Sequence, residues 1–244
     1  MRLFTGSLIV LFALILPPLC LGQSQGTGII ASSAPPDTPA PLPAPLGPDY
    51  YFSSIQAMQQ AILLLPLPPT PNSATQAANV QTLNTIAGTA STQMVNQAEA
   101  TANYSVFDFS QVLGPGFNAQ NLPLVNQLFN NVTINTADAA SDLKAFYNSP
   151  GPQMPETYPS TQTMLGVVEG TLLSDMLPQK QGQLQAFGFQ EGLNRLILYA
   201  HWPTDVSSGM MLGGILVNDL FASPQFVSDF NAAKSELIAQ QSKQ

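Results

Sequence analysis

Charged side chains are scarce in this chain. Lys and Arg together number six among 244 residues, and charged residues make up 8% of the sequence, against roughly 25% in an ordinary soluble domain. The formal net charge is −8 and the pI is about 4.2. Nucleic-acid binding depends on clustered Lys and Arg that neutralise phosphates, so the composition excludes nucleic acid as the partner. The hydrophobic content of 45% is nevertheless enough for a sizeable core.

Cysteine and histidine are almost absent, since Cys20 and His201 are the only residues of these types. Structural and catalytic zinc sites draw most of their ligands from Cys and His, so we expect no metal and no other cofactor. Cys20 lies in an N-terminal stretch that we expect to be removed. The mature protein would then have no disulfide.

The first 22 residues have the features of a cleavable signal peptide. Arg2 supplies the positive charge, the following run to Leu16 is almost unbroken apolar, and Cys20-Leu21-Gly22 offers small residues to a signal peptidase. A membrane anchor is the alternative, but the apolar run is short and ends at Pro17-Pro18. We therefore expect a periplasmic or secreted protein with no stable membrane anchor after signal removal.

The rest of the chain divides into a linker and one helical domain. Residues 23–48 are rich in Pro and Ala and cannot bury a core, so a disordered linker is expected. From 49 to 244 the apolar residues recur at helical spacing, which predicts an all-α, compact multi-helix bundle. A loop or short helix is expected at Phe107–Gly116. The longer predicted helices are Ser53–Leu65, Ser73–Asn103, Leu122–Tyr147, Ser160–Met176, Gln181–Tyr199, Pro203–Phe221 and Pro224–Gln240.

His201 lies six residues after Arg195 and four before Asp205. A neutral imidazole can act as a nucleophile, a carboxylate can fix its tautomer, and arginine binds phosphate oxygens through a planar fork. A helix that begins at Pro203 would leave His201 just before its N-terminus, where free amides favour an anion. Asp205 would then lie within reach of the ring. The alternative interpretation is a lone histidine at a helix end.

Three blocks resemble the signature of the bacterial class A nonspecific acid phosphatases, within the superfamily of type 2 phosphatidic acid phosphatases and vanadium haloperoxidases. That signature is Lys-x6-Arg-Pro, then Pro-Ser-Gly-His, then Ser-Arg-x5-His-x3-Asp. The third block here matches at every spacing and differs only at the leading Ser. The three blocks in this chain read Lys144-x6-Gly151-Pro152, Pro159-Ser160-Thr161-Gln162 and Asn194-Arg195-x5-His201-x3-Asp205. The resemblance covers roughly Asp49 to the end and implies the family's helical bundle.

The resemblance implies a role for each matching residue. In the family, the histidine of the third block attacks phosphorus and becomes phosphohistidine, so His201 would be the nucleophile and Asp205 would orient it. Lys144, Arg195 and the Ser160 hydroxyl would hold the phosphate oxygens. The family's phosphatases require no metal, and the partner would be a phosphate ester or inorganic phosphate. A homo-oligomer is compatible with the sequence.

Three family residues are missing, because Gly151 replaces an arginine, Thr161 replaces a glycine, and Gln162 replaces the histidine that protonates the leaving group. General acid catalysis contributes about 10²–10⁴-fold to rate, so turnover of alkyl phosphates should be strongly reduced. Two hypotheses follow: an exported phosphatase of reduced or altered activity, or a catalytically inactive protein that binds phosphate or a partner on the same scaffold. A vanadium haloperoxidase is disfavoured, because its cationic cradle would contain only Lys144 and Arg195.

Overall fold

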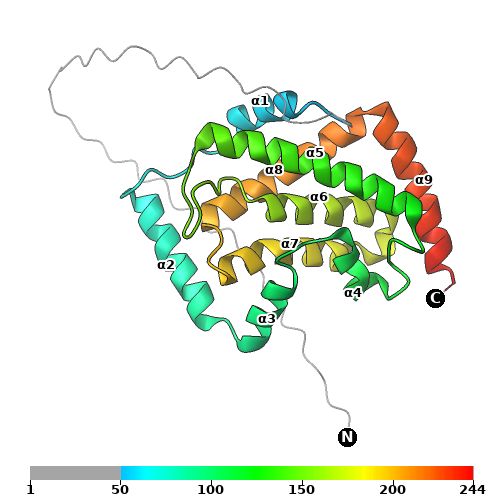
Figure 1. The fold of residues 1–244 in the computed structure, drawn as a ribbon, viewed down its shortest axis with the longest axis horizontal. Helices are drawn as coiled ribbons and strands as arrows, with labels where there is room; N and C mark the ends of the chain where they lie inside the picture. The colour runs from blue at the N-terminus through cyan, green and yellow to red at the C-terminus, as the bar shows by residue number, and fades with distance from the viewer. Residues whose placement is uncertain (1–50, 244) are drawn as a thin grey trace, which may run out of the picture. The chain divides into compact units, whose positions relative to one another are not determined.

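The computed structural model describes residues 51–243, and within them every regular element is a helix (Figure 1). The all-α prediction is therefore confirmed. The predicted signal peptide at 1–22 and the predicted linker at 23–48 lie outside the described residues. The elements are α1 (Ser54–Leu64), α2 (Ala74–Thr89), α3 (Thr92–Ala100), the 3₁₀ turn η1 (Val106–Phe109), α4 (Ser110–Leu113), α5 (Pro123–Tyr147), α6 (Thr161–Met176), the 3₁₀ turn η2 (Pro178–Lys180), α7 (Gln181–Ile197), α8 (Pro203–Ala222) and α9 (Pro224–Gln241).

Most helix boundaries follow local capping signals in the sequence. α2, α3, α6 and α9 each begin directly after a serine whose hydroxyl accepts a hydrogen bond from a backbone N–H of the first turn. These serines are Ser73, Ser91, Ser160 and Ser223. Proline is the first residue of α5, α8 and α9, where its fixed φ suits the helix and its missing N–H costs no bond. These signals explain why the predicted bounds agree closely with the observed ones.

The single helix predicted for 73–103 is wrong. The chain leaves the helix at Ala90, which is extended with φ −66° and ψ 128°, and re-enters it at Thr92 after Ser91. The Ser91 hydroxyl accepts a hydrogen bond from Met94 N at 3.3 Å, so the serine starts a new helix instead of continuing the old one. Gly88 is a weak point of the pattern and lies two residues before the break, but the Ala- and Gln-rich composition gives both halves good helix propensity and so predicts one helix.

α6 is the central helix of the bundle. Twelve of its sixteen residues are buried, and it packs against α5, α7, α8 and α9 (Figure 1). Its closest neighbour is α7, because Gly166 and Gly188 face each other. A Cβ added at Gly188 would lie 2.1 Å from Gly166 O, so no side chain fits at this crossing. The pair brings the two backbones into direct contact and sets the distance between α6 and α7.

α8 and α9 bury their apolar residues in the same core, among them Leu212, Leu216, Leu220, Phe226 and Phe230. Of the helices within residues 51–243, none alone is long and apolar enough to cross a membrane. α8 and α9 pass that test only as a pair, and the chain turns by 97° between them.

α2 and α3 lie at the periphery, against α7 and α8. Only Asn79 and Leu83 are buried in α2, and only Ala98 is buried in α3. Leu83 packs in a small cluster with Leu196 and Val206, separate from the main core. We call residues 74–100 the cover segment. Because it buries so little apolar surface, we expect it to open more readily than the bundle beneath it.

Candidate active site

The five predicted site residues come together where four helix ends meet. Lys144 lies in the last turn of α5, Ser160 precedes α6, Arg195 lies near the end of α7, and His201 and Asp205 lie at the start of α8. Figure 1 shows these four ends at the same end of the bundle, next to α2. Ser160 N donates to Asp205 O at 3.0 Å, which ties α6 to α8.

His201 and Asp205 have the arrangement that a nucleophilic imidazole requires. α8 begins at Pro203, as expected, and His201 Nδ1 lies 3.5 Å from Asp205 Oδ2. The same carboxylate oxygen accepts a hydrogen bond from Trp202 N at 3.0 Å, which fixes it at the helix start. Burial lowers the pKa of His201, and the charges of Lys144 and Arg195 add to this, against the opposing effect of Asp205. The lowered pKa favours the neutral imidazole, the form that can attack.

Arg195 is already partly engaged by the cover segment. Its Nη2 donates to Ala98 O at 3.2 Å and to Thr101 O and Oγ1 at 3.4 Å each. Glu191 Oε2 lies 3.8 Å from the same nitrogen. One nitrogen of the predicted phosphate clamp thus holds the C-terminal end of α3. Nε is buried and has no hydrogen-bond partner among the described residues.

Ser160 is the N-cap of α6. Its hydroxyl accepts hydrogen bonds from Thr163 N at 3.4 Å and from Thr163 Oγ1 at 2.8 Å, so its own proton is left to donate. Thr161 and Gln162 are the first two residues of α6, and their amides belong to the group that has no partner within the helix. The start of α6 therefore favours an anion near Ser160.

The loop after α5 leaves no room for a side chain at Gly151, the position at which the resembled signature has its first arginine. A Cβ at Gly151 would lie 2.3 Å from Thr157 Cγ2 and 2.6 Å from Thr157 Oγ1. Thr157 is fully buried, and its backbone N donates to Ser149 O at 3.0 Å. Gly151 N donates to Met154 O at 2.8 Å within the same turn. The space beside residue 151 is thus filled by Thr157, which sequence reasoning did not reveal.

The candidate site is closed. His201 and Arg195 are each 3% exposed, Asp205 is 1% exposed and Ser160 is fully buried. The cover segment is held over it by Asn79 Nδ2, which donates to Thr204 Oγ1 at 3.0 Å, and by Leu83. Trp202 Nε1 donates to Pro150 O at 3.0 Å, which draws in the loop after α5. A phosphate ester could reach the imidazole only after one of these two segments moves.

Several buried polar atoms at this site have no hydrogen-bond partner among the described residues. They are Thr157 Oγ1, Arg195 Nε and Asp205 Oδ1, while His201 Nδ1 has the Asp205 carboxylate at 3.5 Å. Buried polar atoms are normally satisfied, so a cluster of exceptions indicates a place suited to a polar ligand. Among the described residues, no three His, Cys, Asp or Glu side chains lie close enough to hold a metal ion.

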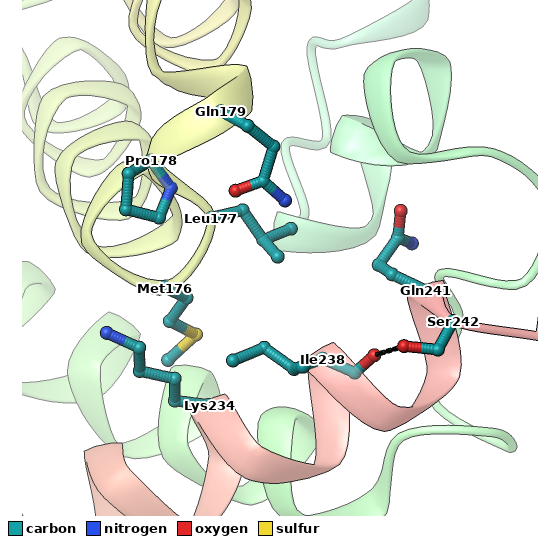
Figure 2. A pocket seen from close by; sticks show the side chains of 8 residues that line it. All are labelled: Met176, Leu177, Pro178, Gln179, Lys234, Ile238, Gln241 and Ser242. Carbon is teal, nitrogen blue, oxygen red and sulfur yellow. Dashed lines mark hydrogen bonds between the residues drawn. The ribbon is translucent and has the colours of Figure 1, made fainter.

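A recess of about 400 Å³ lies elsewhere, between the α6–η2 connection and the end of α9 (Figure 2). It begins at Met176, the last residue of α6, whereas the candidate site lies at the first. Lys234 is its only lining cation, and its Nζ donates to Asp175 O at 2.8 Å. None of the predicted site residues lines the recess, and it lies at the opposite end of α6, so it is not the substrate pocket of the candidate site.

Comparison of the sequence with known proteins finds similar proteins. The chain is 25% identical over 248 residues to a non-specific acid phosphatase of Providencia stuartii, which covers 91% of this chain and 96% of that protein. It is 28% identical over 147 residues to a non-specific acid phosphatase of Salmonella typhimurium, covering 53% of this chain and 59% of that protein. No protein-family model matches. The chain is similar to the non-specific acid phosphatases.

This similarity supports the acid phosphatase resemblance as a whole, while the roles of the individual motif residues stay predictions. Three features of the site could not be predicted from the sequence. They are the position of Thr157, the cover segment, and the buried pair that Glu191 and Asn194 form next to Arg195. Thr157 and Asn194 are ordinary polar residues in sequence. In the cover segment, α2 has too weak an apolar face to indicate where it docks.

Proposed function

We propose that this protein is an exported acid phosphatase-like hydrolase that cleaves phosphate monoesters slowly, through a phosphohistidine at His201. The observation that carries the proposal is the neutral, buried imidazole beside Asp205, at the point where the α6 N-terminus and two cations meet. The similarity to non-specific acid phosphatases over most of the chain supports it.

In the proposed reaction, His201 Nε2 attacks phosphorus while Nδ1 faces Asp205. The bond from phosphorus to the ester oxygen breaks, and the oxygen leaves with the electron pair as an alkoxide or phenolate, which takes a proton from water. Water then attacks the phosphohistidine, releases inorganic phosphate and restores the imidazole. Asp205 stabilises the positive charge that forms on the ring. Lys144, Arg195 Nε and the α6 amides would stabilise the charge on the phosphate oxygens in the transition state.

The leaving group is the weak point of this reaction. Gln162 occupies the position of the family's acid and cannot donate a proton to an alkoxide. Glu156, in the loop after α5, is close enough to Lys144 to act on its pKa, but it is exposed to solvent. Substrates whose leaving groups need little protonation, such as aryl phosphates and phosphoanhydrides, should therefore be favoured over alkyl phosphates.

The second candidate function is phosphate binding without turnover. Its support is the closure of the site: Arg195 is partly bound to α3, and Thr157 fills the space beside residue 151. A protein of this kind would still bind phosphate at the start of α6.

Hydrolysis of p-nitrophenyl phosphate by the purified protein tests the first candidate against the second. We expect slow release of nitrophenol, loss of that release in His201→Ala, and a mass increase at His201 when the reaction is quenched. Activity that is unchanged in His201→Ala would overturn the phosphohistidine proposal. Stabilisation of the fold by inorganic phosphate, together with no turnover, would favour the second candidate.

A further inference from the structure

Behind Arg195 lies a buried polar network. Glu191, Asn194 and Arg195 lie at i, i+3 and i+4 on α7, so they share one face of the helix. Glu191 and Asn194 are each 1% exposed. Asn194 Nδ2 donates to Glu191 Oε1 at 3.1 Å and to Thr101 Oγ1 at 3.0 Å, which holds the carboxyl group in place. The network therefore joins α7 to the turn that follows α3.

Glu191 and phosphate would be two anions sharing one buried cation. Glu191 Oε2 is buried, has no hydrogen-bond partner within residues 51–243 and lies 3.8 Å from Arg195 Nη2. The α3 carbonyls bind the same nitrogen. An ionised Glu191 thus partly neutralises the guanidinium at Nη2, while Nε has no hydrogen-bond partner among the described residues. A carboxylate so close to a buried cation also repels a phosphate that approaches that cation, because the buried surroundings screen charges weakly.

The other groups that face Glu191 are few and are not cationic. Thr101 lies on the turn after α3, Asp108 on η1, and Tyr104 and Glu169 complete the surroundings. Burial raises the pKa of Glu191 to about 6; Asp108 adds to this, and Thr101, Arg195 and Asn194 oppose it. Burial raises the pKa of Glu169 to about 8, so that carboxyl stays neutral where Glu191 titrates.

We propose that Glu191 is a positioning residue for Arg195, and that phosphate binding at the candidate site is coupled to protonation of Glu191. The ionised carboxylate holds the guanidinium toward α3 and weakens its attraction for phosphate. The protonated carboxyl frees the full positive charge for the ligand. Since coupling between two bound species is reciprocal, phosphate binding takes up a proton at Glu191. This inference rests on the phosphate site of the proposed function, but it does not require turnover.

The test is calorimetry of inorganic phosphate binding to the full-length protein between pH 5 and 8, in buffers of different ionisation enthalpy. Glu191→Gln is compared with wild type, with Glu191→Asp, and with Glu99→Gln, an exposed glutamate on α3 that serves as the matched control. The ionisation of phosphate itself is common to all four proteins and cancels in the ratio of their Kd values. Circular dichroism checks that each variant is folded.

We expect Glu191→Gln to bind phosphate about tenfold more tightly than wild type at pH 7.5 and equally at pH 5, as for other coupled sites. Proton uptake on binding should fall in this variant, while Glu191→Asp and Glu99→Gln behave like wild type. Equal pH profiles in Glu191→Gln and wild type, or a loss of affinity that is the same at every pH, overturn the coupling. Absence of phosphate binding at every pH also overturns it.

The two proposals fail separately. If phosphate binds with the expected pH dependence but no ester is hydrolysed, the proposed catalysis fails and the coupling stands. If His201-dependent hydrolysis occurs and Glu191→Gln leaves the binding profile unchanged, the coupling fails and the catalysis stands.

Discussion

The two halves of the candidate site differ in how they are built. The half at the α7–α8 connection places His201 and Asp205 four residues apart across the start of one helix, so local backbone geometry fixes their distance. The other half, from Gly151 to Gln162, depends on side chains from a loop that must converge on a ligand. The local half has the nucleophile and the orienting carboxylate that the proposed reaction requires. The loop half has Gly151 and Gln162 where the signature that the sequence resembles has an arginine and a histidine, and Thr157 fills the space beside residue 151.

The largest expected effect is in the intact half. His201→Ala should reduce p-nitrophenyl phosphate turnover by about 10³-fold or more, because the proposed phosphohistidine cannot form without the imidazole. Steady-state kinetics measures this loss. Ser207→Ala, an exposed change on the first turns of the same helix, is the matched control and should keep its activity. Equal losses in both variants would mean that the helix and not the imidazole was disturbed.

The altered half should respond in the opposite direction. Gln162→His returns an acid to the first turn of α6, and we expect turnover of alkyl phosphates to rise by about tenfold or more. Aryl phosphate turnover should rise much less, because a phenolate leaves without protonation. The measurement is the ratio of kcat/KM for the two esters in variant and wild type. An equal gain for both esters would point to a change in access instead of proton donation.

Gly151→Arg tests whether Thr157 prevents an arginine at position 151 from binding phosphate. The single change should destabilise the fold by about 1–3 kcal/mol, the usual cost of overpacking, and should not improve phosphate affinity. Adding Thr157→Gly should recover stability and tighten phosphate binding, relative to Thr157→Gly alone. Urea denaturation and phosphate calorimetry give the two readouts. If Gly151→Arg alone is as stable as wild type, the loop after α5 rearranges more easily than its hydrogen bonds suggest.

Loosening the cover segment should have a smaller effect on activity. Leu83→Ala removes the one leucine that α2 buries, at a local cost of about 2–5 kcal/mol. We expect faster hydrogen exchange over residues 74–100 and a several-fold increase in kcat/KM, because the closed site opens more often. Val80→Ala, on the exposed side of α2, is the control. Unchanged kinetics alongside faster exchange would mean that esters enter past the loop after α5.

The smallest effect concerns pH. His201 attacks only when neutral, its pKa is lowered chiefly by burial, and the charge of Lys144 lowers it further. The acid limb of activity, where the imidazole takes up a proton, should therefore lie below the ordinary pKa of a histidine, apart from the loss of affinity expected at higher pH as Glu191 ionises. Lys144→Gln should raise the pKa of His201 and move this acid limb toward higher pH, measured as kcat/KM against pH. A limb that does not move would place Lys144 too far from the ring to influence it.

Most of the fold could be predicted from the sequence, because capping serines and first-turn prolines mark the ends of the helices. Proline at 203 and 224 and serine at 160 predicted the bounds of three helices, and the His201–Asp205 spacing then predicted their proximity. What it could not supply were contacts between residues far apart in the chain. The bond from Arg195 to the end of α3 joins positions about a hundred residues apart, and neither partner has a pattern that indicates the other.

The glycine contact between α6 and α7 has a consequence for the site, although it lies away from it. Gly166 is six residues from Ser160, and Gly188 is seven from Arg195, so each lies about 10 Å along its helix from a predicted phosphate ligand. Because α6 and α7 are rigid and their backbones touch at this crossing, a displacement at the crossing also moves the ends of both helices. A methyl group added at position 188 would therefore move an anion-binding helix end relative to its arginine. Loss-of-function variants should accumulate at this crossing, where the residues bear no side chain and touch no substrate.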